Sequence, residues 1–238
     1  MTFVAIIQAR MGSKRLPGKV MFDIFGKPVI EHIVDRLRTC ITLKNIVVAT
    51  STLPQDDIIV NWCVKNGVDY YRGSLSDVLG RYYKAAIQFD VQNIVRITAD
   101  CPLIDPLIVD ETVNGFKLKN YDSYSLAGSF PDGLDVQVFS FDAIKKSHEQ
   151  ATSSFDREHV GNFIERTRPD LFVNGEFHKF KNCGHYRWTL DLPNDFVYIK
   201  KIYEHLYSKG KIFHYFDIMN LINDFPEFQK NNHNIINK

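Results

Sequence analysis

The residues best suited to chemistry lie in one short loop that concentrates positive charge. Four apolar residues at positions 4–7 predict a buried strand, and the segment that follows contains two glycines and four cations. Glycines let successive backbone N–H groups approach an anion, while guanidinium and ammonium groups pair with phosphate oxygens. We therefore predict that the loop binds the phosphates of a small polyanion. Its glycines are Gly12 and Gly18, and its cations are Arg10, Lys14, Arg15 and Lys19.

Two familiar phosphate-binding loops do not match this segment. Lys19 is followed by Val20, so the chain lacks the Gly-Lys-Ser/Thr ending of a Walker loop. Gly12 and Gly18 are six residues apart, which does not fit a dinucleotide-binding fingerprint. The alternative interpretation is a solvated basic turn after an edge strand. The clustering of charge directly after a buried strand favours the phosphate loop.

Two aspartates far apart in the sequence share one local pattern. Asp100 follows a predicted core strand at 93–98, Asp191 follows an alternating apolar-polar segment at 186–190, and each precedes a proline two residues later. A carboxylate at the C-terminal tip of a strand is well placed to hold a metal at the sheet edge, and Mg²⁺ prefers oxygen ligands. We predict Asp100 as a metal ligand, with Asp191 repeating its geometry. A helix-capping role is favoured instead for Asp105, which precedes Pro106.

The first half of the chain alternates predicted strands with predicted helices. Such alternation predicts an α/β fold, with a doubly wound, mostly parallel sheet whose ligands lie beyond the carboxyl ends of the strands. The phosphate loop and Asp100 both lie at such ends. The strands are predicted at 4–7, 45–50, 68–71 and 93–98, with 20–24 extended. The helices are predicted at 29–37, at 54–66, at 76–88 with Ser76 or Asp77 as its cap, and from 106.

From about residue 121 predicted strands no longer alternate with helices, which indicates an antiparallel excursion from the main sheet. We predict one domain, 1–238, because no linker-like segment interrupts it, and within it the excursion at 121–185. Its strands are predicted at 122–126 and 134–140, followed by a helix at 153–166, a strand pair around Gly175 within 171–180 and a strand at 186–190. Helices are then predicted from 193, with Asp195 as a carboxylate of the first turn, and from 213, before a poorly ordered end at 231–238.

Composition excludes several classes of partner. The formal net charge is +1, so the whole surface gives no signal for nucleic acid or an anionic membrane. The four cysteines form no Cys-x-x-Cys pair, and the N-terminus lacks the pattern of a signal peptide, so we expect a reduced, cytoplasmic protein. No apolar run reaches the roughly 18 residues of a membrane span.

Four segments carry a resemblance to a known family. The sequences Gln8-Ala9-Arg10-Met11-Gly12-Ser13, Arg15-Leu16-Pro17-Gly18-Lys19, Asp100-Cys101-Pro102-Leu103-Ile104 and Asp191-Leu192-Pro193 resemble the cytidylyltransferases that make CMP-activated sugars, most of all the spore-coat polysaccharide branch. The resemblance spans nearly the whole chain, although Ala99 stands where relatives usually have glycine. It implies the Rossmann-like fold of nucleotide-diphospho-sugar transferases, CTP as substrate, Mg²⁺ as cofactor, a homodimer and a small acidic or phosphorylated sugar-like acceptor.

The resemblance also implies roles for individual residues. It assigns catalysis to Arg10, Lys19 and Asp100, the metal to Asp100 and Asp191, and nucleotide binding to Ala9, Arg10, Gly12, Ser13, Arg15, Lys19, Asp77 and Arg81. It assigns the acceptor to Asp135, Arg157, Glu158, His159 and Arg187, with Arg157 or Arg187 serving an anionic group. From the residues alone, Arg81 would be an exposed helix residue, and helix surface pairing would explain Glu158 and His159 equally well.

The predicted reaction is attack of an acceptor hydroxyl on the α-phosphorus of CTP, with release of pyrophosphate. Three alternatives remain. A sugar-1-phosphate nucleotidyltransferase would use similar cations but a longer loop motif. A nucleotide-sugar glycosyltransferase usually has an Asp-x-Asp element, and the sequence contains none. A non-catalytic nucleotide-binding protein would be expected to lack Lys19 or a metal carboxylate, and Asp100 and Asp191 are both present.

Overall fold

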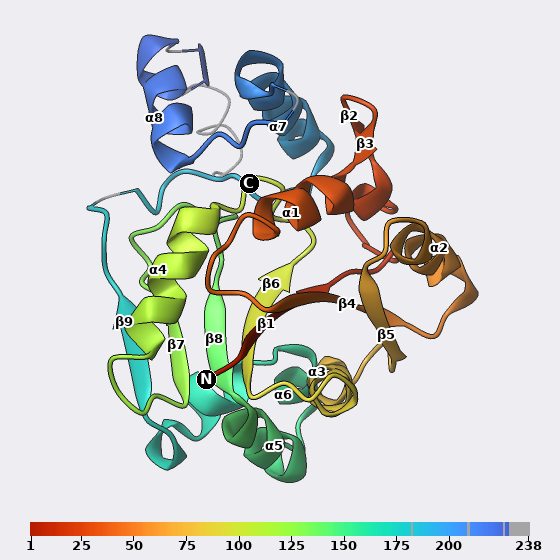
Figure 1. Ribbon diagram of the computed structural model, residues 1–238, viewed down its shortest axis with the longest axis vertical. Helices are drawn as coiled ribbons and strands as arrows, with labels where there is room; N and C mark the ends of the chain where they lie inside the picture. The colour runs from red at the N-terminus through yellow and green to blue at the C-terminus, as the bar shows by residue number, and fades with distance from the viewer. Residues whose placement is uncertain (182, 209, 226, 229–238) are drawn as a thin grey trace.

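A seven-stranded mixed sheet forms the centre of the computed structural model (Figure 1), which describes residues 1–181, 183–208, 210–225 and 227–228. The strand order is β5-β4-β1-β6-β8-β7-β9. The predicted tail at 231–238 lies outside the described residues. The strands are β1 (Phe3–Gln8), β4 (Asn45–Ser51), β5 (Asp69–Gly73), β6 (Asn93–Thr98), β7 (Ser123–Leu126), β8 (Gln137–Ser140) and β9 (Asn174–Phe177), and β2 (Asp23–Ile24) pairs with β3 (Lys27–Pro28) in a separate ribbon.

The direction of chain travel across the sheet reverses beside β1. The chain moves from β1 outward to β4 and β5, then returns to place β6 on the other side of β1, and all of these pairs are parallel. β8 then pairs antiparallel with β6 and with β7, while β9 lies parallel to β7. The predicted doubly wound, mostly parallel sheet with an antiparallel excursion is therefore confirmed. Ligands of such sheets bind where the strand order reverses.

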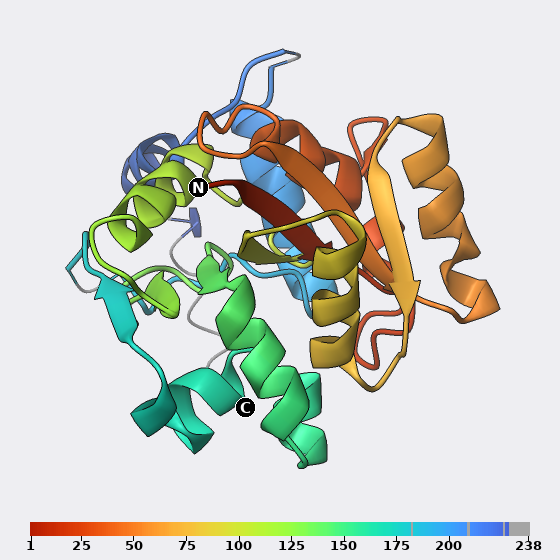
Figure 2. The same cartoon turned by 60° about the horizontal axis from the view of Figure 1, so that its bottom comes forward.

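Helices cover both faces of the sheet because its inner strands are apolar on both sides. The helices α1, α2, α4, α7 and α8 cover one face (Figure 1), and their buried side chains belong to one core. The helices α3 and α5, beside which α6 packs, cover the other face (Figure 2) and contribute to a second core. The helices are α1 (Val29–Leu37), α2 (Asp57–Lys65), α3 (Val78–Gln88), α4 (Pro106–Phe116), α5 (Phe141–Gln150), α6 (Ser154–Glu158), α7 (Pro193–Leu206) and α8 (Tyr215–Asp224).

Predicted helix starts are confirmed where an aspartate accepts backbone N–H groups. Asp77 caps α3 by accepting from Gly80 N–H at 2.9 Å, and Asp105 caps α4 by accepting from Leu107 N–H at 2.9 Å. Asp195 lies in the first turn of α7, as predicted. The first turn of a helix has backbone N–H groups without partners in the helix, and an aspartate can accept from them. An aspartate at such a position is therefore a reliable sign of a helix start.

Several predictions for the excursion are wrong at the level of local structure. The helix predicted at 153–166 is broken into α6 and a π-helical turn (Phe163–Thr167), because Asp156 accepts from Asn162 and Thr167 and draws the chain around. Only β9 forms in 171–180, because Gly175 lies within this strand, which pairs with β7 rather than with a second strand of its own. No strand forms at 186–190, where one bridge joins Asp132 to Arg187.

Two further differences concern helical structure. Lys19–Met21 forms a short 3₁₀ turn, η1, within the segment predicted to be extended at 20–24. The helix α5 was not predicted, although Ser140 caps it by accepting from Ala143 N–H at 3.1 Å. Among the described residues, no helix combines the length and apolar character needed to cross a bilayer.

Candidate active site

The register of the two central strands brings the predicted loops together. Gln8 at the end of β1 pairs with Thr98 at the end of β6, and the N–H of Ala99 donates to the Gln8 carbonyl at 3.0 Å. The phosphate loop and the Asp100 loop therefore leave the sheet side by side. This is the edge at which the strand order reverses.

A buried carboxylate fixes the base of the phosphate loop. Asp56, in the 3₁₀ turn η2 (Pro54–Asp56), is fully buried and accepts from the N–H of Met11 at 2.7 Å. Its other oxygen accepts from the N–H and hydroxyl of Ser51. The Met11 carbonyl accepts from Ser13 N–H and Gly18 N–H, both at 2.9 Å, and Gly18 has a φ of +75° that favours glycine. The loop is thus built before any ligand binds.

Lys19 joins the two predicted metal ligands. Its Nζ lies 2.9 Å from Oδ2 of Asp100 and 2.8 Å from Oδ1 of Asp191, and its side chain is only 10% exposed. Arg15 adds a second cation, at 2.6 Å from Oδ2 of Asp191. Burial acts to raise the pKa of Asp191, but the cations Lys19, Arg15 and Arg187 outweigh it, so that the pKa is lowered. The cations of the site therefore favour the ionised form of Asp191.

Backbone contacts carry Asp191 to this point without a regular strand. The N–H of Leu190 donates to the Asp100 carbonyl at 2.7 Å. Oδ2 of Asp195 then accepts from the N–H groups of Asp191 and Leu192, both at 2.8 Å, and so sets the direction of the chain into α7. The Asp195 carboxylate therefore has two roles: it positions Asp191 and it caps α7.

Arg187 holds three carboxylates of this region. Its nitrogens lie 2.7 Å from Asp132, 3.3 Å from Asp191 and 3.2 Å from Asp195. Burial lowers the pKa of Arg187, but its carboxylate partners more than compensate and raise it. Burial and the neighbouring Asp135 raise the pKa of Asp132 to about 6, although Arg187 opposes the shift. The Asp191 loop is therefore clamped to the Asp132 turn by one guanidinium.

Two cavities meet at Asp100 and Asp191. We call the cavity beside the phosphate loop, of about 410 Å³, the loop cavity, and the cavity over β6, β8 and β7, of about 650 Å³, the inner cavity. Both are lined by Arg96, Thr98, Asp100 and Asp191. The arrangement places a cation-rich loop and a second compartment on either side of a pair of carboxylates. The predicted residues that line the loop cavity are Arg10, Ser13, Arg15, Lys19, Glu158 and His159, and the inner cavity is lined by Asp135.

In the loop cavity, residues at the C-terminal end of α6 face the phosphate loop. Glu158 lies 4.0 Å from Arg10, and the ring of His159 packs on Phe155 with 4.4 Å between centroids. Within the inner cavity, Asp135 accepts from Gly133 N–H at 3.1 Å, while burial raises its pKa. These predicted residues from the excursion therefore reach the same edge of the sheet as the loop.

Six predicted residues line neither cavity. Ala9 and Gly12 contribute backbone to the loop, and a side chain at Gly12 would meet Gln55 at 2.8 Å. Arg187 reaches the site through its carboxylate partners. The remaining residues gather at the start of α3: Asp77 is its N-cap, Arg81 lies in its first turns, and Arg157 contacts Asp77.

Arg81 is not the exposed helix residue that its position in the sequence suggests. Its side chain is 1% exposed, and Nη1 donates to the Ser74 carbonyl at 3.1 Å. Its Nε and Nη2 are buried and find no hydrogen-bond partner among the described residues, and burial lowers its pKa. The burial arises because Arg81 packs under Gly73, where any added Cβ would lie 3.1 Å from the arginine side chain.

Arg157 has local partners. It donates to the carbonyls of Ala151 and His148 at 2.9 and 2.8 Å, and its Nη1 lies 3.4 Å from Asp77. Its donors thus tie α6 to the end of α5 and to the cap of α3.

The carboxylate pair suits a divalent cation that also binds its substrate. Asp100 and Asp191 converge on one point, now held by Lys19. No set of three or more His, Cys, Asp or Glu side chains in the described part of the chain could hold a metal by itself. Two carboxylates are nevertheless a fitting donor set for Mg²⁺, which usually completes its shell with water and phosphate oxygens.

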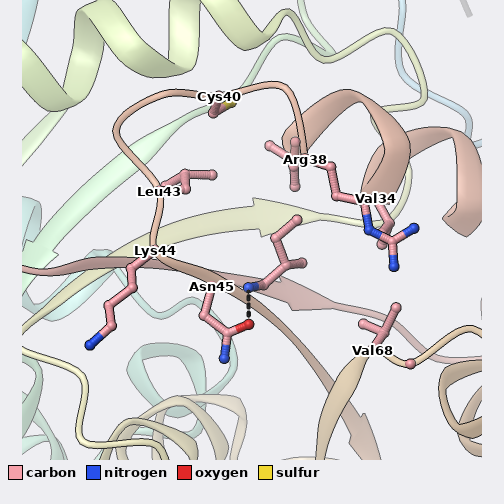
Figure 3. Close-up of a pocket in the computed structure, with 10 residues that line it drawn as sticks. Val34, Arg38, Cys40, Leu43, Lys44, Asn45 and Val68 are labelled. Atoms are coloured by element: carbon pink, nitrogen blue, oxygen red, sulfur yellow. Dashed lines mark hydrogen bonds between the residues drawn. The ribbon is translucent and has the colours of Figure 1, made fainter. Parts of the chain in front are cut away.

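A separate hollow of about 210 Å³ lies at the opposite end of the sheet, where α1 gives way to β4 (Figure 3). Two of its polar side chains already have partners: Asn45 accepts from Ile46 N–H at 2.8 Å, and Arg38 donates to the Asn66 carbonyl at 3.1 Å. Figure 3 shows the amine of Lys44 pointing away from the hollow. The hollow lies far from the carboxyl ends of the strands and takes no part in the candidate site.

Comparison with known proteins identifies the family. The cytidylyltransferase family model matches residues 4–218, and the chain belongs to this family. It is therefore a CTP-dependent nucleotidyltransferase. The spore coat polysaccharide biosynthesis protein SpsF of Bacillus subtilis is 33% identical over 208 residues, which cover 84% of this chain and 85% of that protein.

Solved structures agree with the fold. A cytidylyltransferase from Leptospira borgpetersenii superposes with a TM-score of 0.90 at 31% identity, covering 96% of each chain. A synthetase of CMP-2-keto-3-deoxy-manno-octonic acid, solved with CTP, shares the fold with a TM-score of 0.63 at 14% identity, covering 86% of this chain and 99% of that one. A manganese complex of Rv0371c from Mycobacterium tuberculosis also shares it, at 12% identity and a TM-score of 0.61, with 84% and 99% covered.

Proposed function

We propose that this enzyme transfers CMP from CTP to a sugar or sugar-like acceptor in a Mg²⁺-dependent reaction that releases pyrophosphate. The single observation that carries the proposal is the meeting of the loop cavity and the inner cavity at Asp100, Asp191 and Lys19. One compartment has the cations that a triphosphate requires. The other offers room for an acceptor beside the same carboxylates.

The loop cations would act on the leaving group. As the acceptor hydroxyl attacks the α-phosphorus, the bond to pyrophosphate breaks and negative charge grows on its oxygens. Arg10, Arg15 and Lys19 would stabilise that charge, since preorganised cations in a sheltered site act without reorganisation. Mg²⁺ held by Asp100 and Asp191 would neutralise further phosphate charge.

Nucleotide contacts extend from the phosphate loop toward α3. Ala9, Gly12 and Ser13 would present the loop backbone to the phosphates. The free donors of Arg81, which is buried and lines neither cavity, would reach a carbonyl of the base through a small shift of the turn before α3, whose position Asp77 fixes as the helix cap. A hydrogen bond to a buried N–H group that has no partner contributes more binding free energy than one to a donor that is already paired.

On the acceptor side, we propose contacts from Asp135, Glu158 and His159. Arg157 and Arg187 would act mainly through the carboxylates and carbonyls that they already bind, with Arg187 holding Asp191 in place. The polysaccharide role of SpsF, as its name states, supports an acceptor destined for a cell-surface glycan. We further propose a homodimer that works in the cytoplasm, where the unpaired thiols of the described cysteines would stay reduced.

The direct test is pyrophosphate release from CTP, UTP, ATP and GTP in turn, each with Mg²⁺ and a panel of keto-deoxy sugar acids, sugar phosphates and small phosphorylated polyols. We expect release confined to CTP and to one acceptor class. Comparable release from another nucleotide would favour a sugar-1-phosphate nucleotidyltransferase, and binding of CTP with no release from any acceptor would favour a nucleotide-binding protein.

A further inference from the structure

The two carboxylates of the site are held in different ways. Asp191 pairs with three cations, whereas among the described residues the Asp100 carboxylate has a single ion pair, to Lys19. We call residues 100–105, which connect β6 to α4, the Asp100 loop. The position of the Asp100 carboxylate therefore depends mainly on how the backbone of this loop is fixed.

Two buried side chains from distant helices bind carbonyls of the Asp100 loop. Nε of Arg36, on α1, donates to the Ile104 carbonyl at 2.6 Å. The hydroxyl of Tyr203, on α7, donates to the Pro102 carbonyl at 2.7 Å. The exposed fractions of the arginine and the tyrosine are 2% and 1%. Since α1 and α7 cover the same face of the sheet (Figure 1), both bonds reach the loop from one layer of helices.

Arg36 also links the Asp100 loop to the segment between α7 and α8. Its Nη2 donates to the Phe213 carbonyl at 2.6 Å, and its guanidinium carbon lies 4.5 Å from the centre of the phenylalanine ring. The N–H of Tyr215 donates to Asp105 at 2.6 Å, and Nδ1 of His214 lies 3.0 Å from the same carboxylate. The end of the loop is thus tied to a segment more than a hundred residues away in the chain.

Stability alone gives little reason for an arginine at position 36. Among the described residues its guanidinium forms no ion pair and donates to neutral carbonyls. Burial lowers the pKa of Arg36, although Tyr203 and Asp105 oppose the shift. Removing a charge from water is unfavourable, and a well-packed apolar side chain often gives equal or greater stability. A fixed Ile104 carbonyl, by contrast, requires a donor at this point.

We propose that Arg36 is a positioning residue for the transfer reaction, which holds the Asp100 loop so that the Asp100 carboxylate stays opposite Asp191. Arg36 lines neither the loop cavity nor the inner cavity, so it acts on the reaction through the loop. Tyr203 supports the same loop with a neutral donor, whose hydrogen bond is weaker than one from a charged group. The inference rests on the proposed role of Asp100 in CMP transfer.

The first measurement is hydrogen exchange of the free enzyme, which needs no turnover. Within the loop, the N–H of Cys101 donates to the Thr98 carbonyl at 3.2 Å and the N–H of Ile104 to the Cys101 carbonyl at 3.0 Å. We expect these amides to exchange about tenfold or more faster in Arg36→Met, with the phosphate loop unchanged. The control is Arg38→Met, which makes the same change at an exposed position of the same helical segment and should leave both loops as in wild type.

The second measurement is pyrophosphate release at saturating CTP and Mg²⁺, with the acceptor of the panel above that supports it. Arg36→Met should be about tenfold or more slower, with a KM for CTP within about threefold of wild type, because the phosphate loop keeps its own anchor. In an Asp100→Asn background the same substitution should change the rate less than about twofold, since Arg36 acts through Asp100. Tyr203→Phe should show the same effects to a smaller extent.

Three results would overturn the proposal: wild-type exchange of the Asp100 loop in Arg36→Met, equal effects in Arg38→Met, or an undiminished loss of rate in the Asp100→Asn background. If Arg36→Met does not fold, Tyr203→Phe decides, and wild-type exchange and rate in that variant would overturn the proposal. If wild type releases no pyrophosphate with any acceptor, the proposed function fails, and hydrogen exchange shows separately whether Arg36 holds the loop.

Discussion

Asp100 and Asp191 share one ammonium group: Nζ of Lys19 lies within 2.9 Å of a carboxylate oxygen of each. Lys19 thus stands where a cation bridging the two carboxylates would lie. The ion pairs keep the carboxylates close without a metal, because two unpaired negative charges at this distance would repel each other. Loading of Mg·CTP would then move the lysine from carboxylate to phosphate.

This relationship predicts that Lys19→Met raises the affinity of the free enzyme for divalent cations. Without the ammonium group, a metal no longer competes with a bound charge for Asp100 and Asp191. Mn²⁺ binding followed by electron paramagnetic resonance should be tighter in Lys19→Met than in wild type. Lys14→Met, which removes an exposed cation of the same loop, should leave Mn²⁺ affinity unchanged. Equal Mn²⁺ affinity in all three proteins would show that Lys19 does not occupy the metal position.

The same Lys19→Met variant should turn over CTP about 10²–10³-fold more slowly at saturating substrate. The reason is that Lys19 would stabilise the charge that develops on pyrophosphate. Steady-state pyrophosphate release measures this loss. A fall in affinity for CTP with kcat preserved would instead assign Lys19 to binding alone.

Removing the anchor of the phosphate loop should weaken nucleotide binding. Asp56→Asn replaces one acceptor oxygen by an NH₂ group, so that the N–H of Met11 or the groups of Ser51 lose their partner. We expect a loss of about 1–3 kcal/mol in the free energy of unfolding and a higher KM for CTP. Asp57→Asn, at the neighbouring exposed carboxylate, is the matched control for chemical denaturation and kinetics. An unchanged KM in Asp56→Asn would mean that the loop holds its shape without this contact.

Gly133 should tolerate no side chain. Its φ is +104°, and an added Cβ would lie 2.4 Å from the carbonyl carbon of Trp188. Gly133→Ala should therefore lower the free energy of unfolding by more than about 3 kcal/mol. Gly26→Ala meets no atom within 4 Å at a φ of +79° and should cost about 1–2 kcal/mol. Similar losses for the two variants in urea unfolding would show that the backbone at Trp188 moves aside.

The raised pKa of Asp132, about 6, gives stability a defined pH dependence. The folded state holds this proton at a higher pH than the unfolded chain, whose carboxyl titrates near 3.8. Its contribution is fully present below pH 3.8 and is lost as pH rises through 6. The asparagine of Asp132→Asn does not titrate in this range, so the variant does not share the loss of stability. Its melting temperature relative to wild type should therefore rise between pH 4 and pH 7. A constant difference across that range, measured without metal, would contradict the shift.

The sequence predicts most of the central sheet and part of the site, for local reasons. The apolar runs at β1, β4 and β6 predict strands because both faces are buried, and Asp77 and Asp105 predict helix starts because a cap acts within three residues. The proline pattern after Asp100 and Asp191 also finds both carboxylates that meet at Lys19.

What the sequence does not predict depends on contacts between distant segments. Asp56 looks like one more polar residue at a helix start, and its bond to Met11 arises only because β4, which precedes it, pairs with β1. Arg81 is buried because the turn at Gly73 closes over it. Arg96 lies inside an apolar strand pattern, and its link to Glu165 crosses from β6 to the turn after α6.

The measurement that tests the central claim most directly is the rate of pyrophosphate release from CTP by Asp100→Asn and by wild type, each titrated with Mg²⁺ at saturating CTP and acceptor. The two proteins should melt within a few degrees of each other, because an asparagine side chain has nearly the same shape as the aspartate that it replaces. We predict that the variant is about a hundredfold or more slower at every Mg²⁺ concentration. A variant that matches the wild-type rate at the same Mg²⁺ concentration would contradict the assignment of Asp100 to the metal.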